Sequence, residues 1–342
     1  MKGIQKTILV VGGAGYIGSH MVLALQDAGY SVVVFDNLSR GFADAVGSAP
    51  LVVGDLRSPA DLDACFAAHS IDLVMHFAAL AYVGESVTEP ELYYQNNVVG
   101  ALNLLAAMRR HRVGRLVFSS TCATYGEPDS VPIAERHPQR PINPYGRTKL
   151  MIEQALADYA TAYGLQSISL RYFNATGCDP KGRVGERHDP ETHLIPLVLA
   201  EAQRIKRGGD LAETRLSVFG TDFPTADGSC VRDYIHVADL CSAHLLAAER
   251  LLTDKASVVE VYNLANGAGF SVLEVIAACR EVTGQPIRYR VMPPRAGDPA
   301  VLIGDAGKVA KFLGWHPAYA DLRQIIATTW AWLEVRSCTK CH

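Results

Sequence analysis

The chain has 342 residues, of which 49% are hydrophobic and 20% are charged, and its formal net charge at pH 7 is -3. This balance is typical of a globular protein with a sizeable core, and the length suits two lobes or one large α/β domain. The net charge gives no electrostatic footprint for nucleic acid, which would need a basic excess or stripe. No apolar run reaches the ~18 residues of a membrane-spanning helix. We therefore expect neither a nucleic-acid partner nor a membrane partner.

The N-terminus and the cysteines predict a cytoplasmic location. Met1–Lys6 leads into the apolar run Ile8–Val11, which is too short for a signal-peptide core and is followed by glycines. Most of the eight cysteines are scattered through apolar segments, as expected of free thiols in a reducing compartment. The exception is the tail, where Cys338, Cys341 and His342 have a spacing found in haem-attachment motifs and in half of a zinc site. Since no second ligand pair accompanies them, we interpret the tail as a frayed end and expect no metal site.

The first half of the chain alternates strand and helix patterns. Apolar, β-branched runs predict strands at Thr7–Val11, Ser31–Phe35, Leu51–Val53, Asp72–Phe77 and Arg115–Ser119. Helical patterns are found at Tyr16–Ala28, Pro59–Ala68, Asn97–Arg110 and Tyr145–Tyr163. Continuous apolar strands between helices predict an α/β fold of the Rossmann type, with a doubly wound parallel sheet that is covered on both faces.

From Ala175 the pattern changes. Thr176–Pro190 is rich in Gly, Pro and charge, which predicts a loop that crosses between lobes. Ser271 and Glu274 have the spacing of a capping box at the start of a helix. The expected helices are His193–Arg207 and Val272–Thr283, the expected strands are Leu216–Gly220, Glu260–Leu264 and Gln285–Met292, and a loop follows at Pro293–Pro299. We expect a nucleotide-binding domain over residues 1–175, a smaller α+β substrate lobe over residues 176–336 with some segments returning to the first sheet, and a tail over residues 337–342.

A glycine motif, Gly12-Gly-Ala-Gly15-Tyr-Ile-Gly18, follows the first strand and opens the first helix. Gly12 allows a tight turn, Gly15 lets the backbone approach a pyrophosphate, and Gly18 lets helix and strand pack closely. The helix N-terminus offers N–H donors and a positive dipole end to the phosphates. Asp36 ends the second strand, where its carboxylate can accept hydrogen bonds from a ribose and repel a 2′-phosphate, so NAD is favoured over NADP. Arg40 is the one feature that favours NADP.

Further candidates lie at the C-terminal ends of strands, where open parallel sheets bind ligands. Asp55 follows the third strand, and Phe77-Ala-Ala79 follows the fourth, although Phe77 could equally serve core packing. The fifth strand leads into Thr121, whose hydroxyl can bridge a substrate hydroxyl and a catalytic base. Ser119 and Ser120 are the rivals of Thr121, with capping of strand-end backbone groups as their alternative role.

Tyr145-Gly-Arg-Thr-Lys149 carries the most informative chemistry in the chain. At a spacing of i and i+4, Tyr145 and Lys149 lie on one helix face. A tyrosine with a pKa near ~10 is a poor base at neutral pH. A nearby ammonium group and the positive charge of a nicotinamide would both favour the phenolate, so we expect a lowered pKa for Tyr145. The alternative for Lys149 is a solvated surface lysine.

These motifs together resemble the extended short-chain dehydrogenase/reductase superfamily. Other segments are similar to UDP-glucose (UDP-galactose) 4-epimerases, and the resemblance runs from about Ile8 to Trp332. The segments are His76-Phe-Ala-Ala79, Val83-Gly-Glu-Ser86, Asn96-Asn-Val98, Arg171-Tyr-Phe-Asn174, Val231-Arg-Asp-Tyr-Ile-His236 and Arg295-Ala-Gly-Asp298.

The resemblance implies reversible 4-epimerisation of a UDP-hexose through a 4-keto intermediate, with transient hydride transfer to tightly bound NAD. Tyr145 would take the proton of the sugar 4-hydroxyl, Lys149 would hold the nicotinamide ribose, and Thr121 would relay the hydrogen bond. The expected cofactor contacts are Gly12, Gly15, Tyr16, Ile17, Gly18, Asp36, Asn37, Asp55, Leu56, Phe77, Ala78, Ala79, Asn96, Ser119, Tyr145, Lys149 and Tyr172. The expected substrate contacts are Ser120, Thr121, Asn174, His193, Leu194, Phe219, Arg232, Arg295 and Asp298. A homodimer through the helices Asn97–Arg110 and Tyr145–Tyr163 is implied as well.

Departures from the family pattern and rival functions leave parts of this interpretation open. His193 stands where many members have Asn, Ala81 stands where some have Lys, and Leu302 stands where side-chain size affects acceptance of N-acetylated sugars. Nucleotide-sugar 4,6-dehydratases carry an Asp-Glu pair directly after the strand-end Thr, whereas this chain has Cys122 and Ala123. A UDP-pentose 4-epimerase for UDP-xylose and UDP-arabinose has the same chemistry and stays an alternative. A catalytically silent NAD-binding sensor is disfavoured, since such proteins usually lose the tyrosine or the lysine.

Overall fold

The computed structural model describes residues 5–253, 259–295 and 299–339. Its main sheet has seven strands in the order β10-β6-β5-β4-β1-β2-β3, and every neighbouring pair is parallel. The strands are β1 (Thr7–Val11), β2 (Ser31–Asp36), β3 (Leu51–Val53), β4 (Leu73–His76), β5 (Arg115–Thr121), β6 (Gln166–Tyr172) and β10 (Val259–Leu264). The order reverses between β1 and β4, and open α/β sheets bind ligands outside such a switch point. The predicted Rossmann-type fold is confirmed.

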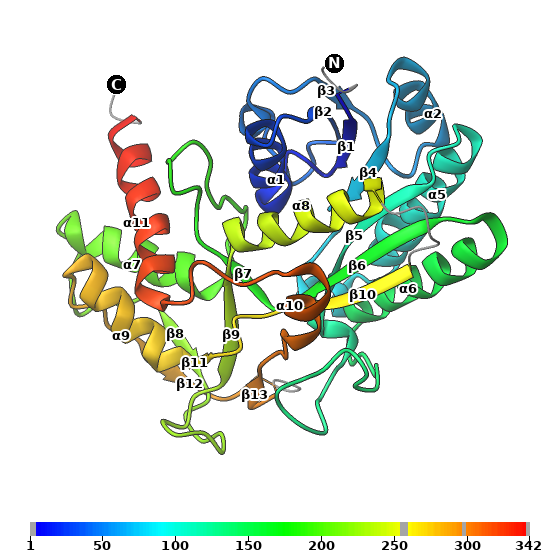
Figure 1. Ribbon diagram of the computed structural model, residues 1–342. Coiled ribbons are helices and arrows are strands. Elements are labelled where there is room, and N and C mark those ends of the chain that lie inside the picture. The colour runs from blue at the N-terminus through cyan, green and yellow to red at the C-terminus, as the bar shows by residue number, and fades with distance from the viewer. Residues whose placement is uncertain (1–4, 254–258, 296–298, 340–342) are drawn as a thin grey trace.

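Helices cover both faces of this sheet (Figure 1). One face packs against α1 (Tyr16–Asp27), α8 (Val237–Thr253) and α10 (Gly307–Leu313), and the other packs against α2 (Pro59–Ala68), α5 (Gly100–Arg110) and α6 (Pro144–Tyr163). Because both faces are covered, β1 is buried along almost its whole length. Short helices complete this part: η1 (Ala43–Val46), α3 (Val83–Thr88), α4 (Pro90–Tyr93), η2 (Tyr94–Val99) and η3 (Cys122–Thr124).

A smaller lobe lies beside the main sheet, at the left of Figure 1. One of its sheets has the order β11-β9-β13 with β7 paired to β9, and the other consists of β12 and β8. Its strands are β7 (Asn174–Thr176), β8 (Ser217–Phe219), β9 (Val231–His236), β11 (Gly269–Ser271), β12 (Arg290–Met292) and β13 (Val301–Leu302). The helices α7 (Leu194–Lys206), α9 (Val272–Thr283) and α11 (Leu322–Thr339) share one apolar core with β8, β9 and β11. The predicted capping box of Ser271 and Glu274 is present at the start of α9.

Sequence patterns missed β6, β9, α8 and α11. In β6 the polar residues Ser167, Ser169 and Arg171 alternate with apolar ones, which suggests a surface strand, yet all of them are buried. After β9, the chain leaves the smaller lobe, forms α8 against the main sheet and enters the sheet as β10. The predicted helix Asn97–Arg110 begins as α-helix only at Gly100, because π-helical η2 precedes it. Among the helices that the structure describes, none is long and apolar enough to cross a bilayer.

Candidate active site

The glycine motif forms the turn between β1 and α1. Gly12 has a φ of +82°, and a β-carbon there would lie 2.4 Å from the backbone nitrogen of Ala78. A β-carbon on Gly18 would lie 2.1 Å from the carbonyl oxygen of Gly12. At Gly15 the nearest atom would be 3.4 Å away, so the missing side chain leaves free space there. The motif thus combines two close backbone approaches with an open position at the helix start.

Helix α1 begins without a stabilising side chain. Its N-cap, Gly15, provides no side-chain hydrogen bond, and the first turn contains no acidic residue. The first N–H groups of the helix and its positive dipole end are therefore free to bind an anion. Ile17 continues this turn and packs against the apolar core. The side chain of Tyr16 points elsewhere: its hydroxyl donates a 2.6 Å hydrogen bond to the carbonyl oxygen of Gly177.

Asp36 lies at the edge of a pocket that joins the ends of β1, β2, β3 and β4. Its carboxylate accepts hydrogen bonds from the backbone N–H groups of Ala14 and Leu38, at 3.0 and 2.8 Å. Burial raises the pKa of Asp36, against the effect of these two bonds. The pocket includes these predicted cofactor residues: Gly12, Gly15, Asp36, Asn37, Leu56, Phe77, Ala78, Ala79 and Asn96.

Asp55, beside this pocket, and Arg40, which lines it, already have partners within the protein. Asp55 accepts hydrogen bonds from Asn37 and from Arg57, and the Arg57 guanidinium holds the pKa of its carboxyl well below the usual range. Arg40, the feature that favoured NADP, binds the Glu85 carboxylate at 2.8 Å. It also donates to the carbonyl oxygen of Asp189 at 3.1 Å. Arg40 is thus already engaged by an acidic partner and a carbonyl group.

The predicted catalytic residues meet where α6 approaches the end of β5. Lys149 is 2% exposed, and its Nζ donates a 2.8 Å hydrogen bond to the carbonyl oxygen of Ser119 and lies 6.0 Å from the centre of the Tyr145 ring. The Ser119 hydroxyl is hydrogen-bonded to the hydroxyl of Tyr172. The Thr121 hydroxyl accepts a hydrogen bond from the backbone N–H of Ala123. It also shares a side-chain hydrogen bond with the Tyr145 hydroxyl. Lys149 is therefore a buried residue of the site, and the alternative of a solvated surface lysine is wrong.

Burial controls the ionisation of this cluster. It raises the pKa of Tyr145 above its ordinary value, and the bond with Thr121 opposes the shift only in part. It lowers the pKa of Lys149 to about 7, partly opposed by the charge of Glu153. Without a cofactor, burial therefore raises the pKa of Tyr145, and the expected lowering, which also included the charge of a bound nicotinamide, stays a prediction.

Ser120 faces a different set of partners from Ser119 and Thr121. Its hydroxyl donates a 2.5 Å hydrogen bond to Glu153 on α6, and Glu153 forms an ion pair with Arg171 on β6. The side chains of Glu153 and Arg171 are only 7% and 5% exposed. Arg171 also donates to the hydroxyl of Tyr125. The structure thus places Ser120 in a buried ionic network that connects α6 with β5 and β6.

The predicted substrate residues come from separate segments of the smaller lobe. The guanidinium carbon of Arg295 lies 4.0 Å from the centre of the Phe219 ring, so these two candidates are adjacent. Arg232 on β9 donates a 2.8 Å hydrogen bond to the carbonyl oxygen of Pro299, and its charge acts on the thiol of Cys122, which follows Thr121. Asp298 lies outside the described residues.

The remaining substrate candidates lie at β7 and at the start of α7. Asn174 is exposed on β7, which pairs with β9. Leu194 is the first residue of α7 and is partly buried, with His193 as the N-cap. The Nδ1 atom of His193 lies 2.8 Å from the carboxylate of Glu191, which also accepts from the His193 backbone N–H. His193 therefore takes part in a local polar cluster.

Sequence reasoning named Asn97 only as part of a motif and gave it no role. Asn97 is 1% exposed, and it exchanges hydrogen bonds with the backbone N–H and C=O of Leu80, at 2.9 and 3.0 Å. It also donates to Thr148 on α6, at 3.2 Å. Asn97 therefore holds the loop after β4 against the helix that carries Tyr145 and Lys149. Its position next to Asn96 was the only signal in the sequence.

The comparisons with known proteins agree with this geometry. The pattern described as the NAD dependent epimerase/dehydratase family matches residues 8–265. A UDP-glucose 4-epimerase of Halalkalibacterium halodurans is 52% identical over 325 residues, which make up 95% of each chain. The chain belongs to the NAD dependent epimerase/dehydratase family.

Solved structures of family members superpose closely on this chain. A UDP-glucose 4-epimerase from Brucella ovis in complex with NAD has a TM-score of 0.89 at 48% identity, covering 95% of this chain and 98% of that chain. A UDP-glucose 4-epimerase from Bifidobacterium longum in complex with NAD+ and UDP has a TM-score of 0.89 at 37% identity, covering 97% and 99%. The family resemblance inferred from sequence motifs is confirmed.

The pocket of this epimerase/dehydratase family member fits NAD. The open position at Gly15 and the free N–H groups of α1 suit a pyrophosphate, which carries negative charge. Asp36 offers a carboxylate at the end of β2, where a family member binds the adenosine ribose. Across the switch point, Lys149 and the hydroxyl of Tyr145 are the groups available to a nicotinamide ribose and a substrate.

Proposed function

We propose that the protein is a UDP-glucose 4-epimerase, which interconverts UDP-glucose and UDP-galactose. The observation that carries the proposal is the cluster of Tyr145, Lys149 and Thr121 at the end of β5, in a chain 52% identical to a protein of that name. Bound NAD would supply a reversible hydride acceptor for C4 of the sugar. Because the cycle is redox-neutral overall, we expect the cofactor to stay bound through purification.

Each residue of the cluster has a distinct task in this proposal. The Tyr145 hydroxyl removes the proton from the sugar 4-hydroxyl and returns it after C4 has inverted. Thr121, bonded to Tyr145, orients the reacting hydroxyl groups. Lys149 hydrogen-bonds the nicotinamide ribose and places a positive charge near the phenolate when it is protonated. These roles are supported by the position of Thr121 at the carboxyl end of β5, where α6 brings Tyr145 and Lys149.

The UDP group is held by the smaller lobe in this proposal. Arg232 and Arg295 bind the diphosphate, for which a planar guanidinium fork is well suited. Phe219, adjacent to Arg295, packs against the nucleoside together with Leu194. Asn174 and His193 are the expected polar contacts of the uridine and the sugar, and Asp298 is the expected ribose contact. Holding the UDP group while the sugar turns allows hydride to return to the opposite face.

The residue after Thr121 supports epimerisation over dehydration. Burial raises the pKa of the Cys122 thiol to about 12, so this side chain stays neutral at physiological pH. A neutral thiol is a poor proton shuttle for an elimination step, which requires both an acid and a base. Ala123 carries no ionisable group at all. The two residues that follow Thr121 therefore supply no acid–base pair for an elimination, and Tyr145 alone is sufficient for reversible oxidation at C4.

Two further properties belong to the same proposal. A homodimer through α5 and α6 is supported by exposed apolar side chains on their outer surfaces, which include Leu102 and Met151 at 39% and 43% exposure. A cytoplasmic location is supported by the six described cysteines, all of which are free.

The experiment that tests the function is NMR of the anomeric protons of UDP-galactose with purified protein and no added cofactor. We expect the UDP-glucose signal to grow to a constant ratio without net NADH formation. If conversion occurs only with UDP-xylose, the substrate is a pentose derivative and the hexose proposal is wrong. If neither sugar is converted while NAD is released on denaturation, the protein binds the cofactor without this activity.

A further inference from the structure

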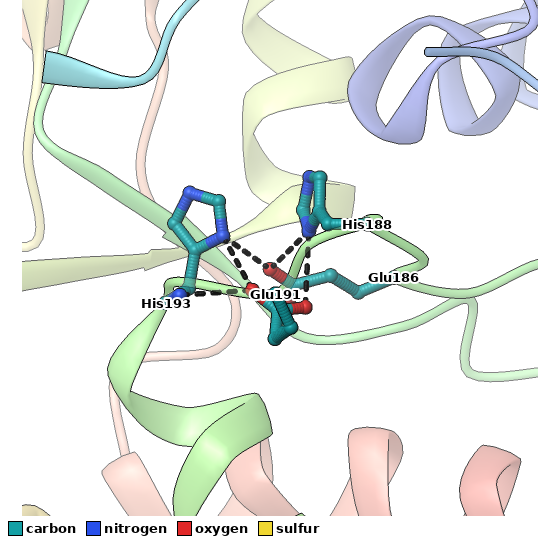
Figure 2. Close-up of side chains that lie close together, drawn as sticks. All are labelled: Glu186, His188, Glu191 and His193. Carbon is teal, nitrogen blue, oxygen red and sulfur yellow. Dashed lines mark hydrogen bonds and ion pairs between the residues drawn. The ribbon is translucent and has the colours of Figure 1, made fainter. Parts of the chain in front are cut away.

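Four potential metal ligands gather in the loop between β7 and α7. They are Glu186, His188, Glu191 and His193, and their ligand atoms all lie within 4.8 Å of one another (Figure 2). The Nδ1 atoms of His188 and His193 lie 3.1 and 2.8 Å from the Glu191 carboxylate. This loop is rich in Gly, Pro and charge, and sequence analysis predicted no metal site in it.

The hydrogen bonds of the cluster do not include the carboxylate of Glu186. Its side chain is 1% exposed, and neither carboxylate oxygen has a hydrogen-bond partner among the described residues. Its Oε1 points into the cluster, 3.6 Å from the Nδ1 atoms of both His188 and His193. A buried carboxylate without partners is costly unless a cation or a set of hydrogen bonds compensates it. Its orientation identifies the centre of the cluster as the place for that cation.

We propose that Glu186, His188, Glu191 and His193 form a binding site for a divalent transition-metal ion of the Zn²⁺ class. Tetrahedral zinc holds its nitrogen and oxygen ligands at ~2.0–2.1 Å, which places neighbouring ligand atoms about 3.3 Å apart. The four separations between a histidine Nδ1 and a carboxylate oxygen, 2.8, 3.1, 3.6 and 3.6 Å, bracket that spacing, with each oxygen of Glu191 facing one histidine. Two imidazole nitrogens favour Zn²⁺, Co²⁺ or Ni²⁺ over Mg²⁺ and Ca²⁺, which prefer oxygen ligands only.

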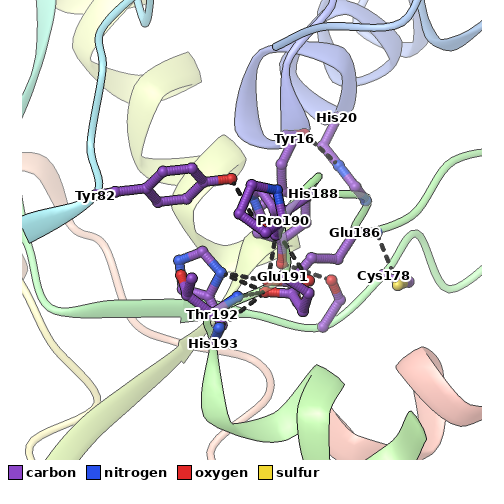
Figure 3. A network of polar contacts seen from close by, with 11 residues as sticks. Tyr16, His20, Tyr82, Cys178, Glu186, His188, Pro190, Glu191, Thr192 and His193 are labelled. Carbon is purple, nitrogen blue, oxygen red and sulfur yellow. Dashed lines mark hydrogen bonds and ion pairs between the residues drawn. The ribbon is translucent and has the colours of Figure 1, made fainter. Parts of the chain in front are cut away.

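Solvent reaches the cluster, and neighbouring tyrosine side chains hold the loop that carries it. The His193 side chain is 44% exposed, so an ion can reach the site from solvent. Tyr82 donates a 3.0 Å hydrogen bond to the carbonyl oxygen of Pro190, and the Tyr16 ring packs edge-on against His188 (Figure 3). Tyr16 belongs to the glycine motif. An ion bound here would fix the loop against the part of the chain that forms the NAD pocket.

The test is Co²⁺ titration of chelator-treated protein, followed by its visible absorption. The C-terminal tail offers competing ligands, so every protein carries Cys338→Ser, Cys341→Ser and His342→Ala. We expect an intense absorption typical of tetrahedral Co²⁺ that saturates at one ion per chain and disappears when Zn²⁺ is added. In the Zn²⁺-loaded protein, X-ray absorption should report nitrogen and oxygen ligands without sulfur. A spectrum with no saturable band, or with sulfur ligands, would overturn the proposal.

Variants locate the site within the chain. We expect His188→Ala and Glu191→Gln to weaken Co²⁺ binding by about tenfold or more, since each loses a ligand. The control His316→Ala replaces an exposed histidine on another segment and should bind Co²⁺ like the parent. If both ligand variants bind Co²⁺ as tightly as the control, the site lies elsewhere and the proposal is wrong.

Glu186→Gln distinguishes a metal ligand from a purely structural residue. In metal-free protein this change removes an unpartnered buried carboxyl group, so we expect the melting temperature to rise. Addition of Zn²⁺ should raise the melting temperature of the parent more than that of the variant, because the variant has lost one ligand and binds the ion more weakly. An equal response to Zn²⁺ in both proteins contradicts the assignment. These readouts do not depend on epimerase activity, so they can fail while the proposed function holds.

Discussion

The Nζ atom of Lys149 is held by the carbonyl oxygen of Ser119 at 2.8 Å and lies 6.0 Å from the centre of the Tyr145 ring. Burial favours the neutral form of both side chains, raising the pKa of Tyr145 and lowering the pKa of Lys149 to about 7. The two residues alone therefore do not produce a phenolate at neutral pH. A further positive charge near the ring, as on a nicotinamide, favours it. We therefore expect base formation in this site to be coupled to cofactor binding.

Replacement of Tyr145 by Phe keeps the ring and removes the acid–base hydroxyl. We expect kcat for UDP-galactose to fall by about 10²- to 10⁴-fold, the range that general acid–base groups contribute. The NAD released on denaturation should stay equal to that of the parent. Tyr163→Phe, at the exposed end of the same helix, is the matched control and should retain full turnover. Parent-like turnover of the Tyr145 variant would exclude this hydroxyl as the base.

The buried amine of Lys149 should make stability depend on pH. Its pKa falls from an ordinary value of 10.5 to about 7 in the folded chain. Between these two values the unfolded chain binds a proton that the folded chain does not, so the free energy of unfolding rises with pH over this window. The cost of burying the charged amine is fully present below pH 7.

Lys149→Met removes this contribution, so the difference in stability between variant and parent should be largest below pH 7 and shrink as pH rises toward 10. The expected slope is about 1.4 kcal/mol per pH unit. It can be measured from urea unfolding midpoints of both proteins after the cofactor has been removed. Lys181→Met, whose side chain is 69% exposed, is the control and should give a difference with no such trend. A pH-independent difference for Lys149→Met would contradict the lowered pKa.

Ser120 offers a direct choice between the role predicted from sequence and the contact seen in the structure. If its hydroxyl mainly supports Glu153, Ser120→Ala should lower the free energy of unfolding by about 1–3 kcal/mol, because a buried carboxylate loses a hydrogen-bond donor. KM for the UDP-sugar should then stay unchanged. The measurements are urea unfolding and steady-state kinetics, with Ser217→Ala on β8 as a control for the substitution itself. A raised KM at unchanged stability would instead support the predicted contact of Ser120 with the substrate.

Cofactor choice should depend on Asp36. We expect Asp36→Ser to weaken NAD binding by about 10- to 100-fold, the value of a hydrogen bond to a charged acceptor, and to improve NADP binding by removing a repulsive charge. Competition binding of NAD and NADP to cofactor-stripped protein measures the ratio of the two affinities. Asp222→Ser, at an exposed position outside the pocket, should leave the ratio unchanged. If Arg40→Ala shifts the ratio instead, Arg40 contacts the cofactor despite its bonds to Glu85 and Asp189.

Local sequence patterns were sufficient to predict the elements whose structure depends on residues close together in the chain. The strand β1, the glycine turn and the capping box of α9 were predicted at or near their observed bounds, because backbone geometry and capping depend on neighbouring residues. Strand β6 was missed because its polar residues are buried by partners far away in sequence, such as Glu153 for Arg171. Helix α8 was missed although its apolar face is buried against the main sheet. No local signal reports such tertiary contacts.

In the candidate active site, too, local sequence patterns identify residues whose roles depend on tertiary contacts. The spacing of Tyr145 and Lys149 identified the pair, but the burial that raises one pKa and lowers the other arises from the packing of α6 against β5. Likewise, the hydroxyls of Ser119 and Ser120 follow each other in sequence and have different partners in space, Tyr172 and Glu153. Alternation along a strand separates such neighbours onto opposite faces. Sequence can name the candidates at a strand end, but tertiary packing assigns their tasks.

The proposed dimer makes a final testable prediction. Leu102 on α5 and Met151 on α6 are 39% and 43% exposed on two helices that pack side by side against the main sheet. Because a charge is costly in an apolar interface, Leu102→Glu combined with Met151→Glu should convert the dimer to a monomer with unchanged secondary structure. Light scattering coupled to size-exclusion chromatography measures the mass in solution. Phe312→Glu, at a 55% exposed residue on α10, is the control and should leave the mass unchanged. A parent protein that elutes as a monomer, or a double variant that stays dimeric, would show that this face is not the interface.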